Sequence, residues 1–182
     1  MKVRRPNENT MRILKMFALG ALIVGIGAVP SPKAVMRIFR VLNKKDSLQN
    51  RKWIRRRLYA LHEQQYVAVH NGMYSLSELG QRVLVENRLW SLSIPKPKVW
   101  DRTWHIVVFD IPKEKTSVRM TFVRLLQNLG FVYYQRSVWI HPYECADQVR
   151  EIAVFYEILP FVAFIKATHA NGSHVLRQHF KL

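Results

Sequence analysis

Apolar side chains recur every three or four residues in the first half of the chain, a spacing that predicts amphipathic helices. Three such segments stand out, at residues 32–42, 47–61 and 78–89. Two short apolar segments, 66–70 and 73–76, lie between the last two helices and are joined by an Asn-Gly pair, the strongest short signal for a β-hairpin. The first half is therefore expected to place a hairpin between helices.

An uncharged run of 15 residues, 16–30, precedes these helices. Basic residues come before it, as in a signal peptide, but the run is shorter than the about 20 residues that a membrane-spanning helix needs. A cleavage site after Ala28 would place Ile26 where a small residue is required. We therefore expect a helix buried in the N-terminal domain, with no stable membrane insertion. Export or membrane tethering of this segment is the alternative.

Strand and helix patterns alternate in the second half. The expected elements are a buried strand at 104–109, a helix at 115–129 ended by Gly130, one long strand at 131–140, a helix at 144–156 and a strand at 161–167. This alternation predicts an α+β fold with the helices on one face of the sheet, in the ferredoxin-like split βαβ arrangement.

The two halves are separated by a segment with two prolines in three positions, Pro95 and Pro97, and no apolar period. We therefore divide the chain into an N-terminal domain at 1–90, with 1–10 disordered, a linker at 91–100, and a C-terminal domain at 101–182.

Charge is distributed unevenly between the halves. The chain has 29 Lys and Arg against 12 Asp and Glu, a net charge of +17, and residues 1–99 carry 19 of the former and 5 of the latter. Such an excess favours a polyanionic partner. The single cysteine, Cys145, excludes an internal disulfide and favours a reducing compartment, the cytoplasm. We expect this thiol to be buried and without chemistry.

The helix at 47–61 is the most basic stretch of the chain. Ile54, Leu58 and Leu61 form its apolar side, and the basic residues lie opposite. The order helix, helix, basic helix, hairpin, helix is the layout of a winged helix-turn-helix domain, whose recognition helix enters the major groove of duplex DNA. The candidate DNA contacts are Lys33, Arg37, Arg51, Lys52, Arg55, Arg56, Tyr59 and, at the hairpin tip, Asn71. A solvated charged face is the alternative.

Three stretches of the second half, at 107–112, 125–130 and 135–139, resemble the CRISPR-associated endonuclease family that partners the integrase during spacer acquisition. Such a domain also forms the central part of the PaaX family, the phenylacetate-type transcriptional repressors, where it follows a winged helix. The chain has the same order and so resembles PaaX-like proteins. The resemblance implies a dimeric transcriptional repressor that binds specific sequences of double-stranded DNA. It allows a small-molecule inducer and implies no cofactor.

Asp110, directly after the first strand of the second half, is the candidate catalytic residue. The resemblance to the endonucleases implies that this carboxylate binds a divalent metal, so a Mg²⁺-dependent nuclease or CRISPR adaptation subunit is the alternative function. The structural alternative is an aspartate that caps the turn before Pro112. His169, His174 and His179 are spaced by five residues, which does not fit a helical zinc site. We expect a regulator rather than an enzyme.

Overall fold

The computed structural model describes residues 8–24, 48–70 and 73–182 and divides the chain into two compact units, Met1–Asn87 and Arg88–Leu182. The expected helix at 32–42, with Lys33 and Arg37, and the hairpin tip at Asn71 lie outside the described residues. In the described part of the chain, no helix combines the length and the apolar character needed to cross a membrane.

The first described element of the N-terminal unit is the helix α1 (Glu8–Val24). Phe17, the described side chain of the uncharged run that packs deepest, is 1 % exposed, as expected for a buried helix. The expectation that residues 1–10 are disordered is wrong for 8–10. Thr10 is buried, and Glu8 and Arg12 form an ion pair of 3.2 Å one helical turn apart, so the helix already begins at Glu8.

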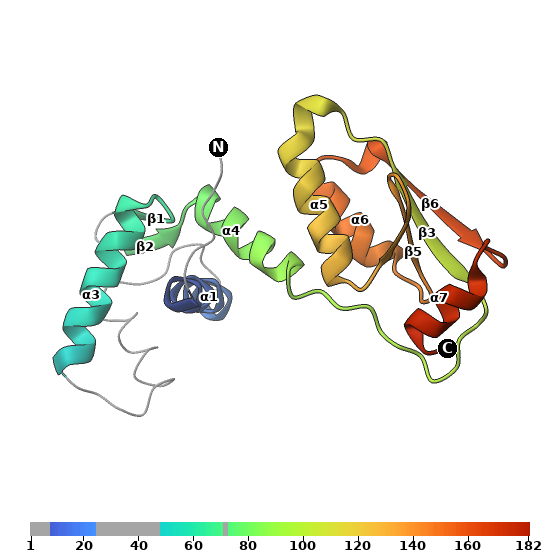
Figure 1. Cartoon of the computed structure of the whole chain (residues 1–182). Helices are drawn as coiled ribbons and strands as arrows, with labels where there is room; N and C mark the ends of the chain where they lie inside the picture. Colours follow the sequence, from blue (N-terminus) through green and yellow to red (C-terminus); the bar gives the residue numbers. More distant parts are fainter. Residues whose placement is uncertain (1–7, 25–47, 71–72) are drawn as a thin grey trace. The chain divides into compact units, whose positions relative to one another are not determined.

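The remaining elements of this unit are α3 (Leu48–Glu63), the strands β1 (Val67–His70) and β2 (Met73–Leu76), and α4 (Glu78–Leu89) (Figure 1). The two strands pair in an antiparallel hairpin, as predicted, and their register runs from Val67 opposite Leu76 to His70 opposite Met73. One core joins these elements with α1: its buried members are Met11, Ile13, Leu14, Phe17, Leu58, Leu61, Tyr66, Val67 and Val83, and the partly buried Tyr74 and Leu76 of β2 pack against it.

A close backbone contact joins α4 to the chain that leads into the hairpin. Gly80 lies in the first turn of α4, and a Cβ at this position would stand 2.1 Å from the carbonyl oxygen of Tyr66. The same oxygen accepts the backbone N–H of Ser77 at 3.1 Å, and the Ser77 hydroxyl caps the helix by accepting the N–H of Gly80 at 3.0 Å. Only glycine fits between these two backbone segments.

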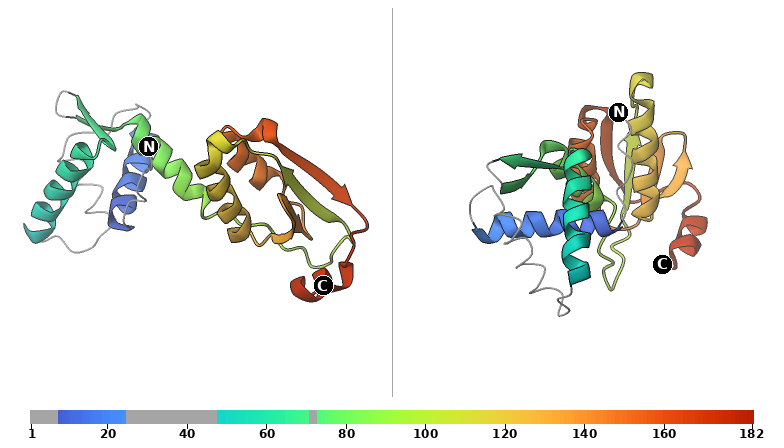
Figure 2. Two further views of the ribbon diagram at one scale, coloured as in Figure 1. Left: turned by 45° about the horizontal axis from the view of Figure 1, so that its top comes forward. Right: turned by 90° about the vertical axis from the view of Figure 1, so that its left-hand side faces the viewer.

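The C-terminal unit contains a four-stranded antiparallel sheet of β3 (Trp104–Phe109), β4 (Val132–Gln135), β5 (Val138–His141) and β6 (Val162–Ala167). The strand order is β4-β5-β3-β6. With α5 (Thr116–Asn128) after β3 and α6 (Ala146–Phe155) after β5, the chain follows the ferredoxin-like β-α-β-β-α-β path. The helices α5 and α6 contact each other and cover one face of the sheet (Figures 1 and 2).

The helix α5 ends as the sequence predicts, at Gly130. This residue has φ +87°, its N–H donates to Gln127 O at 3.0 Å, and the N–H of Phe131 donates to Leu126 O at 3.0 Å. These two bonds form the Schellman motif, in which a left-handed glycine ends the helix. The side chains of Leu126 and Phe131 are both buried in the core that the helices share with the sheet.

The prediction of one long strand at 131–140 is wrong. The segment is a hairpin, because the chain reverses at Arg136 and Ser137, and Ser137 takes the left-handed conformation with φ +61°. Neither residue is glycine, proline or asparagine, so this turn lacks the usual sequence signal. The reversal supplies the strand that the ferredoxin-like topology requires.

The proline-containing segment 91–100 has no helix or strand, yet its N-terminal part is not free of the domain. Trp90, Leu92 and Ile94 pack against the core of the C-terminal unit, and the Asn128 side chain donates to Trp90 O at 3.0 Å. From Pro95 to Val99 the segment is exposed. The apolar residues that precede the prolines thus fasten it to the sheet and helices.

A further helix, α7 (Ser173–Phe180), covers part of the sheet face opposite α5 and α6. Leu176 and Phe180 pack there with Trp104 and Ile140. The sequence analysis gave no element to this end of the chain, and α7 therefore adds a partial third layer to the expected two.

The close contact at Gly80 yields a stability prediction. Alanine normally favours a helix over glycine by about 1 kcal/mol. Here the added methyl group would collide with the Tyr66 carbonyl, so Gly80→Ala is expected to destabilise the N-terminal unit by about 1 to 3 kcal/mol, as overpacking does. Urea unfolding followed by far-ultraviolet circular dichroism measures this. Gln81→Ala, at the exposed neighbouring position, is the control; equal or greater stability of Gly80→Ala would contradict the contact.

Candidate functional site

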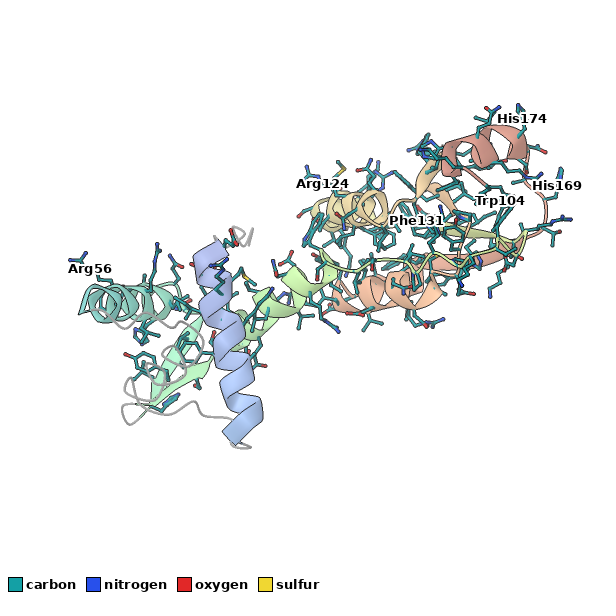
Figure 3. All side chains as sticks on the ribbon, turned by 90° about the horizontal axis from the view of Figure 1, so that it is seen from below. Arg56, Trp104, Arg124, Phe131, His169 and His174 are labelled. Carbon is teal, nitrogen blue, oxygen red and sulfur yellow. The ribbon has the colours of Figure 1, made fainter. Side chains whose placement is uncertain are left out.

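The helix α3 has one buried and one exposed side, as its sequence predicts. Leu58 and Leu61 are each 2 % exposed and pack in the core with α1. Arg56 is exposed, and Tyr59 keeps 67 % of its surface accessible. Figure 3 shows the Arg56 side chain pointing away from the rest of the N-terminal unit. The spacing of these residues therefore separates a packing side from a solvent side.

The other candidates on this helix share its backbone. Arg51, Lys52 and Arg55 lie in the first half of α3. Arg55 and Arg56 follow Lys52 by three and four residues, and Tyr59 follows Arg56 by three. The first turn contains no acidic residue, and Glu63 is the last residue of the helix. Positive charge is thus concentrated along the part of α3 that lies about three to four turns before the first strand of the hairpin.

The hairpin is fixed to the end of α3. Gln65 has φ +60°, and the N–H of Tyr66 donates to Leu61 O at 2.9 Å, so the chain turns directly from the helix into β1. The Ser77 hydroxyl donates to Gln65 O from the other end of the hairpin. The hairpin therefore leaves the C-terminal end of α3 from a defined direction, with Val69 and His70 exposed near its tip.

The C-terminal unit offers a different candidate, Asp110. It lies exposed at the end of β3, and its backbone N–H donates to Phe161 O at 3.0 Å. Asp110 does not cap the short 3₁₀ helix that follows, η1 (Lys113–Lys115), which has Pro112 at its cap position and receives no side-chain cap. No three acidic, histidine or cysteine side chains gather into a metal-binding group in the described ranges. At the end of β3, each chain thus supplies one exposed carboxylate, that of Asp110.

Two buried histidines face each other across neighbouring strands. His105 on β3 is opposite His141 on β5, and they are 5 % and 6 % exposed. The His141 Nδ1 lies 3.1 Å from the backbone N and 3.2 Å from the backbone O of Tyr143, so the tautomer of the ring decides whether it accepts from the first or donates to the second. Its ring packs against Phe131 and against Phe180 of α7, with centroid distances of 5.1 and 5.7 Å. His141 thus contacts aromatic side chains that belong to the cores on both faces of the sheet.

The charged groups around His105 offset only part of the cost of burying a charged imidazole. Its Nδ1 lies 3.7 Å from Glu144 Oε1, and Glu144 also forms an ion pair with Lys166. Its Nε2 is buried without a hydrogen-bond partner among the described residues. Burial lowers the pKa of His105 despite the nearby Glu144 carboxylate, and burial lowers the pKa of His141 to about 4. Both imidazoles are therefore held neutral.

Comparison with known families places the C-terminal unit. Residues 97–178 match the family model of the PaaX protein central Cas2-like domain. This unit is thus similar to the central Cas2-like domain of PaaX proteins. The resemblance inferred from the sequence is thereby confirmed, and the family suggests a transcriptional regulator. No curated protein matches the chain at a significant level.

The PaaX-type domain contains features that the sequence analysis missed. His105, His141 and Lys166 meet only through the sheet register, in which His105 is opposite both His141 and Lys166. His141 and Lys166 lie 36 and 61 residues after His105 along the chain, and no spacing signals their contact. Cys145 was expected to be a buried, idle thiol and is buried; burial raises its pKa to about 12, which keeps it protonated.

Asp110 yields a prediction about the nuclease alternative. One carboxylate per chain supplies little of the ligand set that a hydrolytic metal needs. We expect no cleavage of duplex or single-stranded DNA that depends on Mg²⁺ or Mn²⁺, and Asp110→Ala should bind duplex DNA within about twofold of the original protein, since removing one exposed carboxylate breaks no phosphate contact. Glu114→Ala is the matched control. Metal-dependent cleavage that disappears only in Asp110→Ala would favour the nuclease function.

The histidine pair yields a pH prediction. Because both pKa values are lowered in the folded state, the unfolded chain binds protons first when the pH falls below about 6.5, and the C-terminal unit loses stability from there down to about pH 4. The loss for His141 is expected to be on the order of 2 kcal/mol. Urea unfolding followed by tryptophan fluorescence reports on this unit, which holds four of the five tryptophans.

Substitution separates this effect from general acid unfolding. His141→Gln removes the titrating group and should flatten the stability profile between pH 6.5 and 4. His169→Gln, at an exposed position of the same unit, should leave the profile unchanged. A profile of His141→Gln as steep as that of the original protein would show that His141 does not cause the loss.

Proposed function

We propose that the protein is a transcriptional regulator that binds double-stranded DNA, and that it acts as a dimeric repressor. In this proposal the N-terminal unit is a winged helix-turn-helix domain whose recognition helix is α3. The observation that carries the proposal is that α3 has two different sides. Leu58 and Leu61 are buried on one side, and Arg56 is exposed on the other. The PaaX-type domain in the second unit supports a regulatory role.

The physical fit to duplex DNA is direct. An α-helix fits the major groove, where guanidinium groups bind phosphates and the O6 and N7 atoms of guanine. α3 is 16 residues long and contains Arg51, Lys52, Arg55 and Arg56, with Tyr59 exposed on the same side. The hairpin that leaves its C-terminal end would be the wing, with Asn71 at the tip as a further contact.

The sheet of the C-terminal unit supports the dimer. β4 and β6 are edge strands in the order β4-β5-β3-β6, and an edge strand presents unpaired backbone groups. Ile165 on β6 is 48 % exposed and is opposite Ile106, on the sheet face that α7 covers only in part. A second copy of the chain against this edge and face would cover both, and two-fold symmetry would then set the spacing of two DNA half-sites.

Neutralising the basic side of α3 tests the DNA proposal. The variant Lys52→Gln/Arg55→Gln/Arg56→Gln should weaken duplex binding and flatten the dependence of log K on log salt by roughly 2 to 3. Fluorescence anisotropy with a labelled duplex measures this, and circular dichroism verifies the fold. Lys113→Gln/Arg124→Gln/Arg136→Gln, which removes the same charge from exposed positions in the other unit, is the control. An α3 variant that titrates like this control would refute the recognition helix.

A single substitution tests the dimer. Ile165→Glu places a charge on the exposed sheet edge and should convert the full chain from dimer to monomer at tens of micromolar, since an unpaired charge in an interface is costly. Multi-angle light scattering gives the mass. Val154→Glu, at a similarly exposed apolar position on α6, should remain dimeric. A monomeric original protein, or a dimeric Ile165→Glu, would be inconsistent with this interface.

A further inference from the structure

Positive charge gathers at the C-terminal end of the second unit, although residues 100–182 as a whole are close to neutral. All Asp and Glu residues of this half lie at or before Glu157. The final 25 residues contain three cationic side chains and three histidines: Lys166, Arg177, Lys181, His169, His174 and His179. The small net charge of the half therefore conceals a local excess of positive charge.

The positively charged residues of α7 face solvent because the apolar side of the helix packs against the sheet. Leu176 is 7 % exposed, and Phe180 packs on Trp104 with 6.2 Å between ring centroids. The exposed basic and histidine residues of α7 and its flanking residues are His169, His174, Arg177, His179 and Lys181. Figure 3 shows that His169 and His174 lie at the same end of the unit, close to α7.

One of these cations is held in place by aromatic stacking. The guanidinium carbon of Arg177 lies 5.3 Å from the centre of the Trp100 ring. Trp100 is in turn fixed, because it packs on Trp104 at 4.8 Å and its indole N–H donates to Thr103 O at 3.1 Å. A stacked guanidinium keeps its N–H groups free at the ring edge and has already lost much of its rotamer freedom. Arg177 is thus organised in advance for an anion.

The residues that follow Trp100 add a further cation next to the stacked ring. Arg102 is exposed and has φ +62°. The neighbouring acid is Asp101, whose carboxylate accepts the N–H of Thr103 at 2.9 Å; Lys166 is paired with Glu144 and does not count. We call the remaining set the C-terminal basic patch, and it consists of Arg102, His169, His174, Arg177, His179 and Lys181.

We propose that the C-terminal basic patch binds the sugar-phosphate backbone of duplex DNA as a second contact surface, in the same complex as α3. This inference rests on the proposed function. Guanidinium, ammonium and imidazole N–H groups all donate to phosphate oxygens, and such contacts position a protein without reading sequence. Val175 is the one apolar residue among the exposed positions of α7, and the others are His174, Arg177, Gln178 and His179, which suits a phosphate backbone better than a bilayer interior.

The test compares three variants of the full chain that each lose three positive charges. The patch variant is Arg102→Gln/Arg177→Gln/Lys181→Gln, and the other two are the α3 variant and the control variant on Lys113, Arg124 and Arg136. Binding is measured by anisotropy on a duplex long enough to span both units, over a range of salt concentrations. The patch variant should flatten the log–log salt slope by roughly 2 to 3, equally for random and operator sequences, and the control should not.

The outcomes separate this inference from the proposed function. If the α3 variant loses binding while the patch variant titrates like the control, the regulator proposal stands and the patch inference is overturned. If the original protein binds no duplex at any salt concentration, both fall. Weaker binding of the patch variant to phosphatidylglycerol vesicles, with an unchanged duplex titration, would assign the surface to membranes and also overturn the inference.

A second variant guards against misfolding of the first. His174→Gln/Lys181→Gln leaves the stack of Arg177 on Trp100 intact, so it should retain the fold and the tryptophan fluorescence of the original protein. It should still flatten the salt slope by about 1, because Lys181 is one phosphate-binding cation. An unchanged slope in this folded variant would overturn the inference even if the triple variant does not fold.

Discussion

The burial of Leu58 and Leu61 against α1 decides which side of α3 meets the outside of the protein. Each buried leucine contributes about 1.5 to 3 kcal/mol, whereas burying an unpaired guanidinium would cost several times more. The helix therefore has one stable orientation, with Arg56 in water. Because the hairpin is fixed to the end of α3 by the Tyr66–Leu61 and Ser77–Gln65 hydrogen bonds, the same packing also determines where the hairpin begins. The proposed DNA-binding surface depends on this one contact.

The C-terminal unit depends on a different constraint, the register of its sheet. Pairing of β3 with β5 and β6 brings His105 opposite His141 and Lys166 and sends the apolar residues of alternate positions to opposite faces. One face is covered by α5 and α6, and the other partly by α7. The charges that α7 carries are exposed because its apolar side is committed to Trp104 and Ile140. Surface chemistry in both units thus follows from apolar packing behind it.

Much of this architecture could be predicted from periodicity and turn chemistry. The helix with Leu58 and Leu61, the Asn-Gly hairpin, the buried strand β3 and the end of α5 at Gly130 each have a local signal, and each is confirmed. The reversal at Arg136 and Ser137 has none, so the hairpin β4–β5 was expected as one strand. The histidine contact arises from residues far apart in sequence. The net charge of the second half conceals the C-terminal basic patch, because the acidic residues before residue 158 offset the basic end.

The central claim is that α3 reads duplex DNA by sequence. The most direct measurement is selection of bound duplexes from a fragmented genome by the full chain, followed by sequencing, with the α3 variant in parallel. The account predicts enriched fragments that share an inverted repeat, with half-sites about one helical turn or a multiple of it apart, and loss of this enrichment in the α3 variant. Enrichment no greater than that of random fragments, or an unchanged motif in the α3 variant, would contradict it.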